Sequence, residues 1–70
     1  MKIIANNYNP NEVIKIIREW SEKTQQEFAD SLNKNKNTIQ SWELGRNKMT
    51  FNTLMEIAKK ENLIITIERR

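Results

Sequence analysis

Residues 24–46 read TQQEFADSLNKNKNTIQSWELGR, and their pattern predicts two short helices separated by a polar turn. Thr24 and Glu27 have the spacing of a capping box, in which each side chain satisfies an N–H group at the start of a helix. The first helix is therefore predicted over residues 24–32. Its buried stripe is expected to be Phe28, Ala29 and Leu32.

The second half of this stretch predicts a helix over residues 35–44. Asn35 can cap its start, and Gly45 stands where a helix commonly ends in a left-handed residue. Ile39 and Trp42 are its strongly apolar residues, so only a narrow side of this helix is expected to pack against the rest of the domain. Aromatic residues at helical spacing are usually packed, and Trp42 is therefore expected in the core rather than as a stacking platform for bases.

Helices are also predicted on both sides of this central pair. The sequence NPNE at residues 9–12 opens a helix over residues 10–22, with Asn9 as cap and Pro10 in the first turn. Its apolar stripe is expected to be Val13, Ile16, Ile17 and Trp20. Trp20 is assigned either to the core or to a dimer surface. A fourth helix over residues 50–61 is expected to carry Phe51, Leu54, Ile57 and Ala58.

The two ends of the chain have the composition of strands. In LIITI, residues 63–67, β-branched residues dominate and alternate, which predicts a strand over residues 63–68. The opening MKIIA predicts another over residues 2–5. Because a lone strand is unstable, we expect the two to pair and to leave one edge open to a second subunit. The dimerisation residues are therefore expected to be Leu63, Ile65 and Ile67.

Composition excludes several classes of function. A domain of 70 residues buries only ~60% of the surface that its unfolded chain exposes. The chain has no His and no Cys, so disulfide frameworks and the common zinc sites are excluded. The apolar runs are too short to span a membrane and the start does not resemble a signal peptide, so a cytoplasmic protein is expected. An enzyme is not expected, because the chain has no Gly-rich phosphate loop and its acids stand at cap and surface positions.

Positive charge gathers around the second helix of the central pair. The net charge is +3, yet residues 33–49 hold four bases and one acid: Lys34, Lys36, Arg46, Lys48 and Glu43. On the side of this helix away from Ile39 and Trp42, an arc of roughly 140° holds Lys36, Asn37, Gln40, Ser41 and Leu44.

Residue types in this arc match the edges of base pairs. An amide pairs with N6 and N7 of adenine, and a lysine suits O6 and N7 of guanine. A short helix, a tight polar turn and such a helix form the helix-turn-helix arrangement. The alternative is an ordinary solvated helix face, which uses the same polar residues.

The same stretch resembles the Xre/Cro-type helix-turn-helix family, the phage-repressor-like group. That family has the pattern T-Q-x-E-(apolar)-A, a turn, and then x-T-I-x-x-(W/L)-E-x-G-x-R. It is matched here by Thr24, Gln25, Glu27, Phe28, Ala29, Thr38, Ile39, Trp42, Glu43, Gly45 and Arg46. LMEIAKKENL resembles the family's L-x-x-I-A helix. The resemblance covers residues 12–63 and departs at Asn33, where the family has a small residue, and at Ser21, where it has an apolar one.

The resemblance implies DNA binding and transcriptional control. Together with the helices and end strands predicted above, it describes a mostly α, four-helix repressor-like domain over residues 1–70 with two short strands. It also implies roles for single residues. The base-reading residues would be Lys36, Asn37, Gln40 and Ser41. The phosphate-binding residues would be Gln25, Asn35, Arg46 and Lys48. Arg18 and Glu43 correspond to a buried ion pair between the first and third helices, and the alternative is two independent surface charges.

Two functions follow as expectations. The first is a small phage- or plasmid-type repressor that binds a palindromic operator in double-stranded DNA as a homodimer, through its C-terminal strand. The second is a protein-interaction module such as an antitoxin, whose C-terminal strand would pair with a toxin. No cofactor, metal or membrane partner is expected for either.

Overall fold

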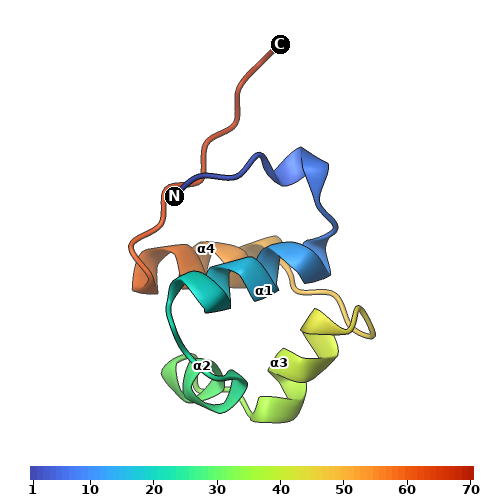
Figure 1. Cartoon of the computed structure of the whole chain (residues 1–70), viewed down its shortest axis with the longest axis vertical. Coiled ribbons are helices and arrows are strands. Elements are labelled where there is room, and N and C mark those ends of the chain that lie inside the picture. The colour runs from blue at the N-terminus through green and yellow to red at the C-terminus, as the bar shows by residue number, and fades with distance from the viewer.

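The computed structural model describes residues 1–70, and its regular structure is entirely helical (Figure 1). A short 3-10 helix, η1 at Ala5–Asn7, comes first. Four α-helices follow: α1 at Pro10–Trp20, α2 at Gln25–Ser31, α3 at Lys36–Glu43 and α4 at Phe51–Lys60. The prediction of a mostly α, four-helix arrangement is therefore confirmed.

The two central helices begin at side chains that cap them. The Thr24 hydroxyl accepts a hydrogen bond from the Glu27 N–H at 3.1 Å, and the Glu27 carboxylate accepts one from the Thr24 N–H at 2.8 Å. The Asn35 side chain accepts a hydrogen bond from the Thr38 N–H at 3.1 Å. Between the helices, Asn33 has a φ of 55°, a left-handed conformation that Asn adopts more readily than most residues. Short-range contacts therefore fix where each helix starts.

One hydrophobic cluster holds the four helices together. Its buried members come from every α-helix: Ile14, Ile17, Phe28, Ala29, Ile39, Trp42 and Ile57. Partly buried residues surround it, namely Val13, Leu32, Met49, Leu54 and Leu63. The expected burial of Trp42 is confirmed, since its exposed fraction is 8%. Phe51, which the sequence placed on the stripe of the fourth helix, is 60% exposed at the first turn of α4.

The buried side of α1 differs from the expected stripe. Ile14 and Ile17 are its buried residues, whereas Ile16 and Trp20 are only partly buried and lie outside the core cluster. The side that faces the core continues with polar residues, because Arg18 and Ser21 hydrogen-bond to side chains of other elements. Because these core-facing positions are polar, the spacing of apolar residues does not reveal them. The predicted apolar side of α1 is therefore rotated around the helix axis relative to the side that is buried.

Polar contacts tie α4 to the rest of the domain. Glu61, which caps α4, accepts hydrogen bonds from the Ser21 hydroxyl and from the Lys23 ammonium, both at 2.8 Å. The Lys60 ammonium donates to the carbonyl of Ser31, the last residue of α2, at 2.7 Å. The end of α4 is therefore fixed against both the loop after α1 and the end of α2.

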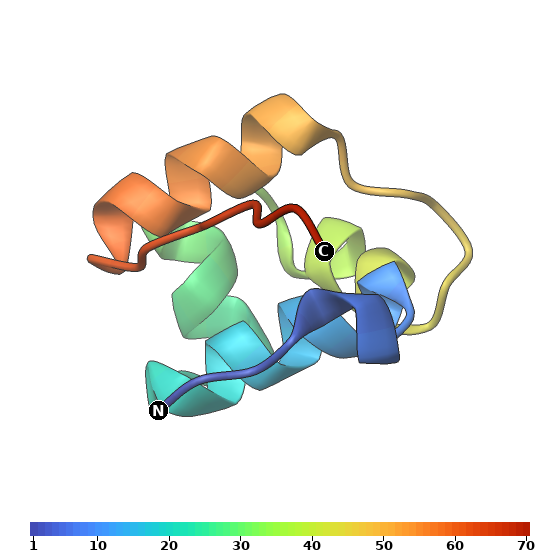
Figure 2. The ribbon, with the colours of Figure 1, turned by 90° about the horizontal axis from the view of Figure 1, so that it is seen from above.

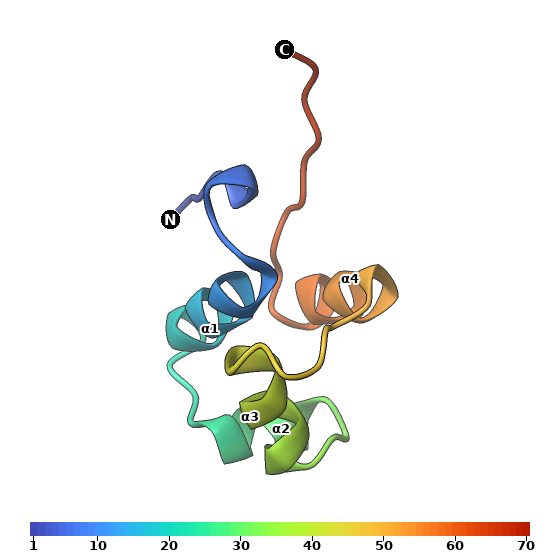
Figure 3. The same cartoon turned by 90° about the vertical axis from the view of Figure 1, so that its right-hand side faces the viewer.

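The expected strands at residues 2–5 and 63–68 are wrong, because no strand is present. The N-terminal residues run irregularly into η1, and the C-terminal segment extends away from the helices (Figures 1 and 3). The Leu63 N–H closes the end of α4 by donating to the Ala58 carbonyl at 2.8 Å. Ile64 and Ile67 beyond it are 88% and 90% exposed. Alternating β-branched residues indicate a preference for extended backbone, but a strand also needs a hydrogen-bonding neighbour.

The helices divide the molecule into two ends. Helices α2 and α3 form one end, α1 and α4 lie across the middle, and both chain termini lie on the far side of α1 and α4 (Figures 1 and 2). This arrangement leaves the outer side of α3 uncovered by the terminal segments. None of the helices has both the length and the apolar character that crossing a membrane requires.

Candidate nucleic-acid interface

Helix α3 is fixed to the domain on one side and open on the other. Ile39 and Trp42 are buried in the core. Lys36, Asn37 and Gln40, on the opposite side, are exposed. The structure therefore brings these three sequence-predicted base readers onto a common outward face, which we call the α3 face. An exposed α-helix is an element that the major groove of B-DNA can admit.

Ser41 stands at the edge of the α3 face and is partly buried. Its hydroxyl oxygen accepts a hydrogen bond from the Asn47 amide at 2.8 Å. A hydroxyl that accepts in this way can still donate its own hydrogen, for example to an acceptor on a base. Sequence reasoning missed Asn47. The signal for it was Gly45, whose left-handed turn folds the chain back over the last turn of α3, where the Arg46 N–H meets the Ser41 carbonyl at 3.0 Å.

The predicted phosphate-binding residues occupy different environments. Arg46 and Lys48 are exposed in the loop after α3, where their charges are free. Asn35 is exposed but already engaged as a cap, since its side-chain oxygen accepts from the Thr38 N–H. Its amide N–H groups are left to donate. Gln25 is partly buried and donates to the Glu43 carboxylate at 3.3 Å.

Arg18 and Glu43 form a two-pronged ion pair between α1 and α3. Arg18 Nε donates to Glu43 Oε2 at 2.7 Å and Arg18 Nη2 donates to Oε1 at 3.0 Å. Their side chains are 16% and 6% exposed. The remaining Arg18 nitrogen donates to the Lys23 carbonyl at 2.9 Å. The hydrogen bonds with Glu43 raise the pKa of Arg18 above its ordinary value, although burial opposes this. The pair therefore locks the orientation of α3.

This ion pair also shapes the charge around the α3 face. Glu43 is the only acid in residues 33–49 and is paired inside the domain. The exposed charges of that segment are therefore all positive: Lys34, Lys36, Arg46 and Lys48. Such a cluster of one sign attracts the phosphate backbone of a nucleic acid.

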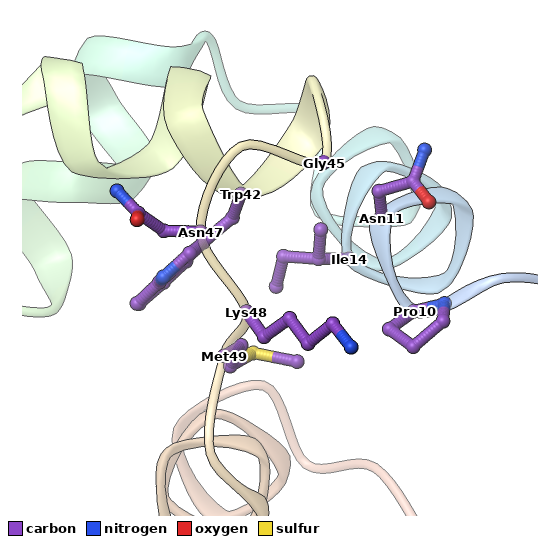
Figure 4. A pocket seen from close by; sticks show the side chains of 8 residues that line it. All are labelled: Pro10, Asn11, Ile14, Trp42, Gly45, Asn47, Lys48 and Met49. Atoms are coloured by element: carbon purple, nitrogen blue, oxygen red, sulfur yellow. The ribbon is translucent and has the colours of Figure 1, made fainter.

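A small hollow lies beneath the loop that follows α3 (Figure 4). Ile14 and Trp42 form part of its lining, and Lys48 reaches across it while Asn47 points to the other side of the loop (Figure 4). Its volume of about 80 Å³ is far below the ~300–1,000 Å³ of small-molecule pockets. No three His, Cys, Asp or Glu residues gather as metal ligands would. The hollow therefore has no room for a nucleotide or similar cofactor.

Comparison with known proteins agrees with this geometry. A family model described as Helix-turn-helix matches residues 14–60, which is more than half of the chain and includes all of α2 and α3. Comparisons with curated proteins and with solved structures found no significant match. With the capped helix pair, the left-handed turn and the exposed α3 face already established, the family match shows that this chain belongs to the Xre/Cro-like helix-turn-helix family of DNA-binding regulators.

Proposed function

We propose that this protein is a transcriptional repressor that binds a two-fold symmetric operator as a homodimer. The observation that carries the proposal is the α3 face, on which Lys36, Asn37 and Gln40 are exposed. Helix α3 cannot turn this face inward, because Ile39, Trp42 and the ion pair of Glu43 hold its other side. A repressor of this kind acts by occupying its operator, so it needs no catalytic group.

In the bound state, α3 would lie in the major groove. Asn37 and Gln40 would each offer an amide to adenine, and Lys36 would donate to guanine O6 or N7. A good bidentate contact contributes about 1–3 kcal/mol of discrimination against the wrong base. Ser41, oriented by Asn47, would add a hydroxyl donor at the edge of the same surface.

Phosphate contacts would supply most of the affinity that is independent of sequence. Arg46 and Lys48 are exposed beside the end of α3, and the amides of Gln25 and Asn35 stand near the starts of α2 and α3. Each phosphate neutralised by a base releases counterions, so binding weakens steeply as salt rises. These contacts position the domain, and the α3 face distinguishes sequences.

A dimer follows from the size of one module. A single recognition helix reads few base pairs and buries little DNA, so its affinity is modest. Two copies whose α3 helices stand about 34 Å apart would enter successive major grooves on one side of the duplex. Of the residues predicted for the dimer contact, Leu63 packs on the core while Ile67 is free.

The test compares Asn37→Ala with Lys48→Ala on two duplexes, one recovered by in vitro selection with the wild-type protein and one of random sequence. Asn37→Ala should weaken binding to the selected duplex by about 1–3 kcal/mol and leave the random duplex unaffected. Lys48→Ala should weaken both and reduce the salt slope by about one. Glu56→Ala, an exposed change on α4, is the control. Equal losses on both duplexes for Asn37→Ala would remove its base-reading role.

An antitoxin is the second candidate, favoured by the exposed apolar residues Ile64 and Ile67, which suit a protein contact. Affinity purification from the native host distinguishes the two candidates. A stoichiometric partner of different sequence, together with weak DNA binding in its absence, would favour the antitoxin. Recovery of the protein alone with full DNA affinity would favour the repressor.

A further inference from the structure

The outer side of α1 carries an apolar surface that the core does not use. Ile16 and Trp20 lie there, partly buried, and line an open hollow of about 340 Å³ together with Met1. Two acids, Glu19 and Glu22, complete its lining. Both acids are exposed. We call this surface the α1 hollow: apolar at its centre and negative at its rim.

The C-terminal segment, residues 64–70, has the opposite character. Its root is fixed, because Leu63 packs on the core and Glu61 is held by Ser21 and Lys23. Beyond the root, the segment extends away from the helices (Figure 3). It presents Ile64 and Ile67 to solvent, and one exposed acid, Glu68, is followed by two exposed bases, Arg69 and Arg70. The segment is therefore mostly apolar over residues 64–67 and carries a net positive charge over residues 68–70.

We propose that the C-terminal segment of one copy docks into the α1 hollow of a second copy, with a reciprocal contact from the second copy to the first. Ile64 and Ile67 would cover Ile16 and Trp20, and Arg69 and Arg70 would meet Glu19 and Glu22. We choose this occupant because its apolar residues match the apolar centre of the α1 hollow and its bases match the acids at the rim. The proposal rests on the proposed homodimeric repressor and supplies its contact surface.

The exposure of the segment argues for a contact between copies rather than within one. Ile64 and Ile67 are 88% and 90% exposed, so the segment does not cover the hollow of its own chain. Seven extended residues reach roughly 23–25 Å, which is enough to cross to a neighbouring molecule. A reciprocal exchange of identical segments closes as a two-fold dimer and leaves no open end for further addition.

The placement of the two surfaces is compatible with DNA binding. Both terminal segments lie on the far side of α1 and α4 from α2 and α3, and Met1 of the α1 hollow belongs to the first of them (Figure 1). A second copy bound there would leave the α3 face open in each subunit. The two-fold axis of the dimer would then match the two-fold symmetry of an operator.

Charge reversal provides the test, with sedimentation equilibrium of the full chain at low salt and without DNA as the measurement. Wild-type protein should dimerise. Glu19→Lys with Glu22→Lys, and separately Arg69→Glu with Arg70→Glu, should each raise the dimer dissociation constant about tenfold or more. Combining all four substitutions should restore dimerisation. Asp30→Lys with Glu56→Lys makes the same change of net charge as the reversal of Glu19 and Glu22, at exposed positions elsewhere, and should have no effect.

A second pair of variants tests the apolar part of the contact. Ile64→Ser with Ile67→Ser removes side chains that are almost fully exposed, so folding should be unchanged while dimerisation weakens. The proposal is overturned if the wild type remains monomeric at all concentrations, if either reversal leaves the dissociation constant unchanged, or if the fourfold variant fails to dimerise. A shift in tryptophan fluorescence upon reversal that is lost when Trp20 is replaced by Phe, without any change in mass, would show docking within one chain and would also overturn it.

The same variants separate this proposal from the proposed function. Binding to a selected half-site duplex depends on the α3 face and not on a second copy. If the protein remains monomeric but binds one half of the selected operator specifically, the proposed dimer contact is wrong and the proposed DNA recognition is retained. If dimerisation responds to the charge reversals as expected but no selected duplex is bound specifically, the proposed repressor function is wrong and the proposed dimer contact is retained.

Discussion

Replacing Arg18 by methionine removes one half of the ion pair that joins α1 to α3. The Glu43 carboxylate, 6% exposed, would lose both of its Arg18 hydrogen bonds and keep only the contact from Gln25 at 3.3 Å. Leaving a buried charge without its partner costs about 3–5 kcal/mol. A domain of 70 residues has a total stability of about 4–10 kcal/mol, so the substitution should cost a large share of it.

The opposite substitution should cost less. Glu43→Gln keeps a hydrogen-bonding side chain of similar shape, and Arg18 retains its bond to the Lys23 carbonyl at 2.9 Å. Arg18 is also the more exposed partner, at 16%, so water can solvate part of its charge. We expect a loss of about 1–3 kcal/mol. Replacing both partners together, Arg18→Met with Glu43→Leu, should bring stability to within about 1–2 kcal/mol of the wild type, because no unpaired charge remains.

Urea denaturation followed by far-ultraviolet circular dichroism measures these differences, with thermal unfolding as a second readout. The Arg18→Met midpoint temperature should fall by at least about 12 °C, since 1 kcal/mol corresponds to about 4–8 °C in a domain of this size. Exposed ion pairs contribute only about 0–1 kcal/mol. A loss below about 1 kcal/mol for Arg18→Met, or a double variant as unstable as Arg18→Met, would refute the argument from burial.

Three further results are expected. Gly45→Ala should lower the free energy of unfolding by about 1–2 kcal/mol in urea denaturation, because its φ of +76° is unfavourable for a residue with a Cβ. The new Cβ would stand 3.8 Å from Asn11 without a clash, so the backbone conformation is the cause, and an unchanged midpoint would contradict this. Asn47→Ala should leave the unfolding midpoint unchanged but weaken binding to the selected duplex more than to a random one, because Ser41 loses its orienting amide; equal losses in a titration would contradict this. Burial opposes ionisation of Glu61, but hydrogen bonds from Lys23 and Ser21 outweigh it and lower its pKa below the ordinary 4.5. Its contribution to stability should therefore be complete above pH 4.5 and lost as pH falls through the lowered pKa, and Glu61→Gln should flatten this acid limb in a series of unfolding curves at different pH.

The strongest sequence predictions concerned features that need only neighbouring residues. Capping by Thr24 and Asn35, and the left-handed turn at Asn33, depend on contacts within four residues, so the sequence contains all of their partners. The roles assigned to the α3 face stay predictions, although the structure shows that face to be exposed. The sequence placed Ser41 beside these residues, but the partner of its hydroxyl, Asn47, could not be predicted, because the turn at Gly45 brings Asn47 to it.

Four helices, their caps and the polar side of α3 can be predicted from the residues alone, because each depends on local hydrogen bonds and on the spacing of a few apolar residues. Which side of α1 is buried, and whether the chain ends form strands, depend instead on how the whole domain packs. Ile14 rather than Ile16 or Trp20 enters the core because α3 and α4 lie on that side of α1, where Arg18 and Ser21 find their partners. The C-terminal segment remains without a strand because an extended backbone needs a neighbour to receive its hydrogen bonds, and the folded helices supply none.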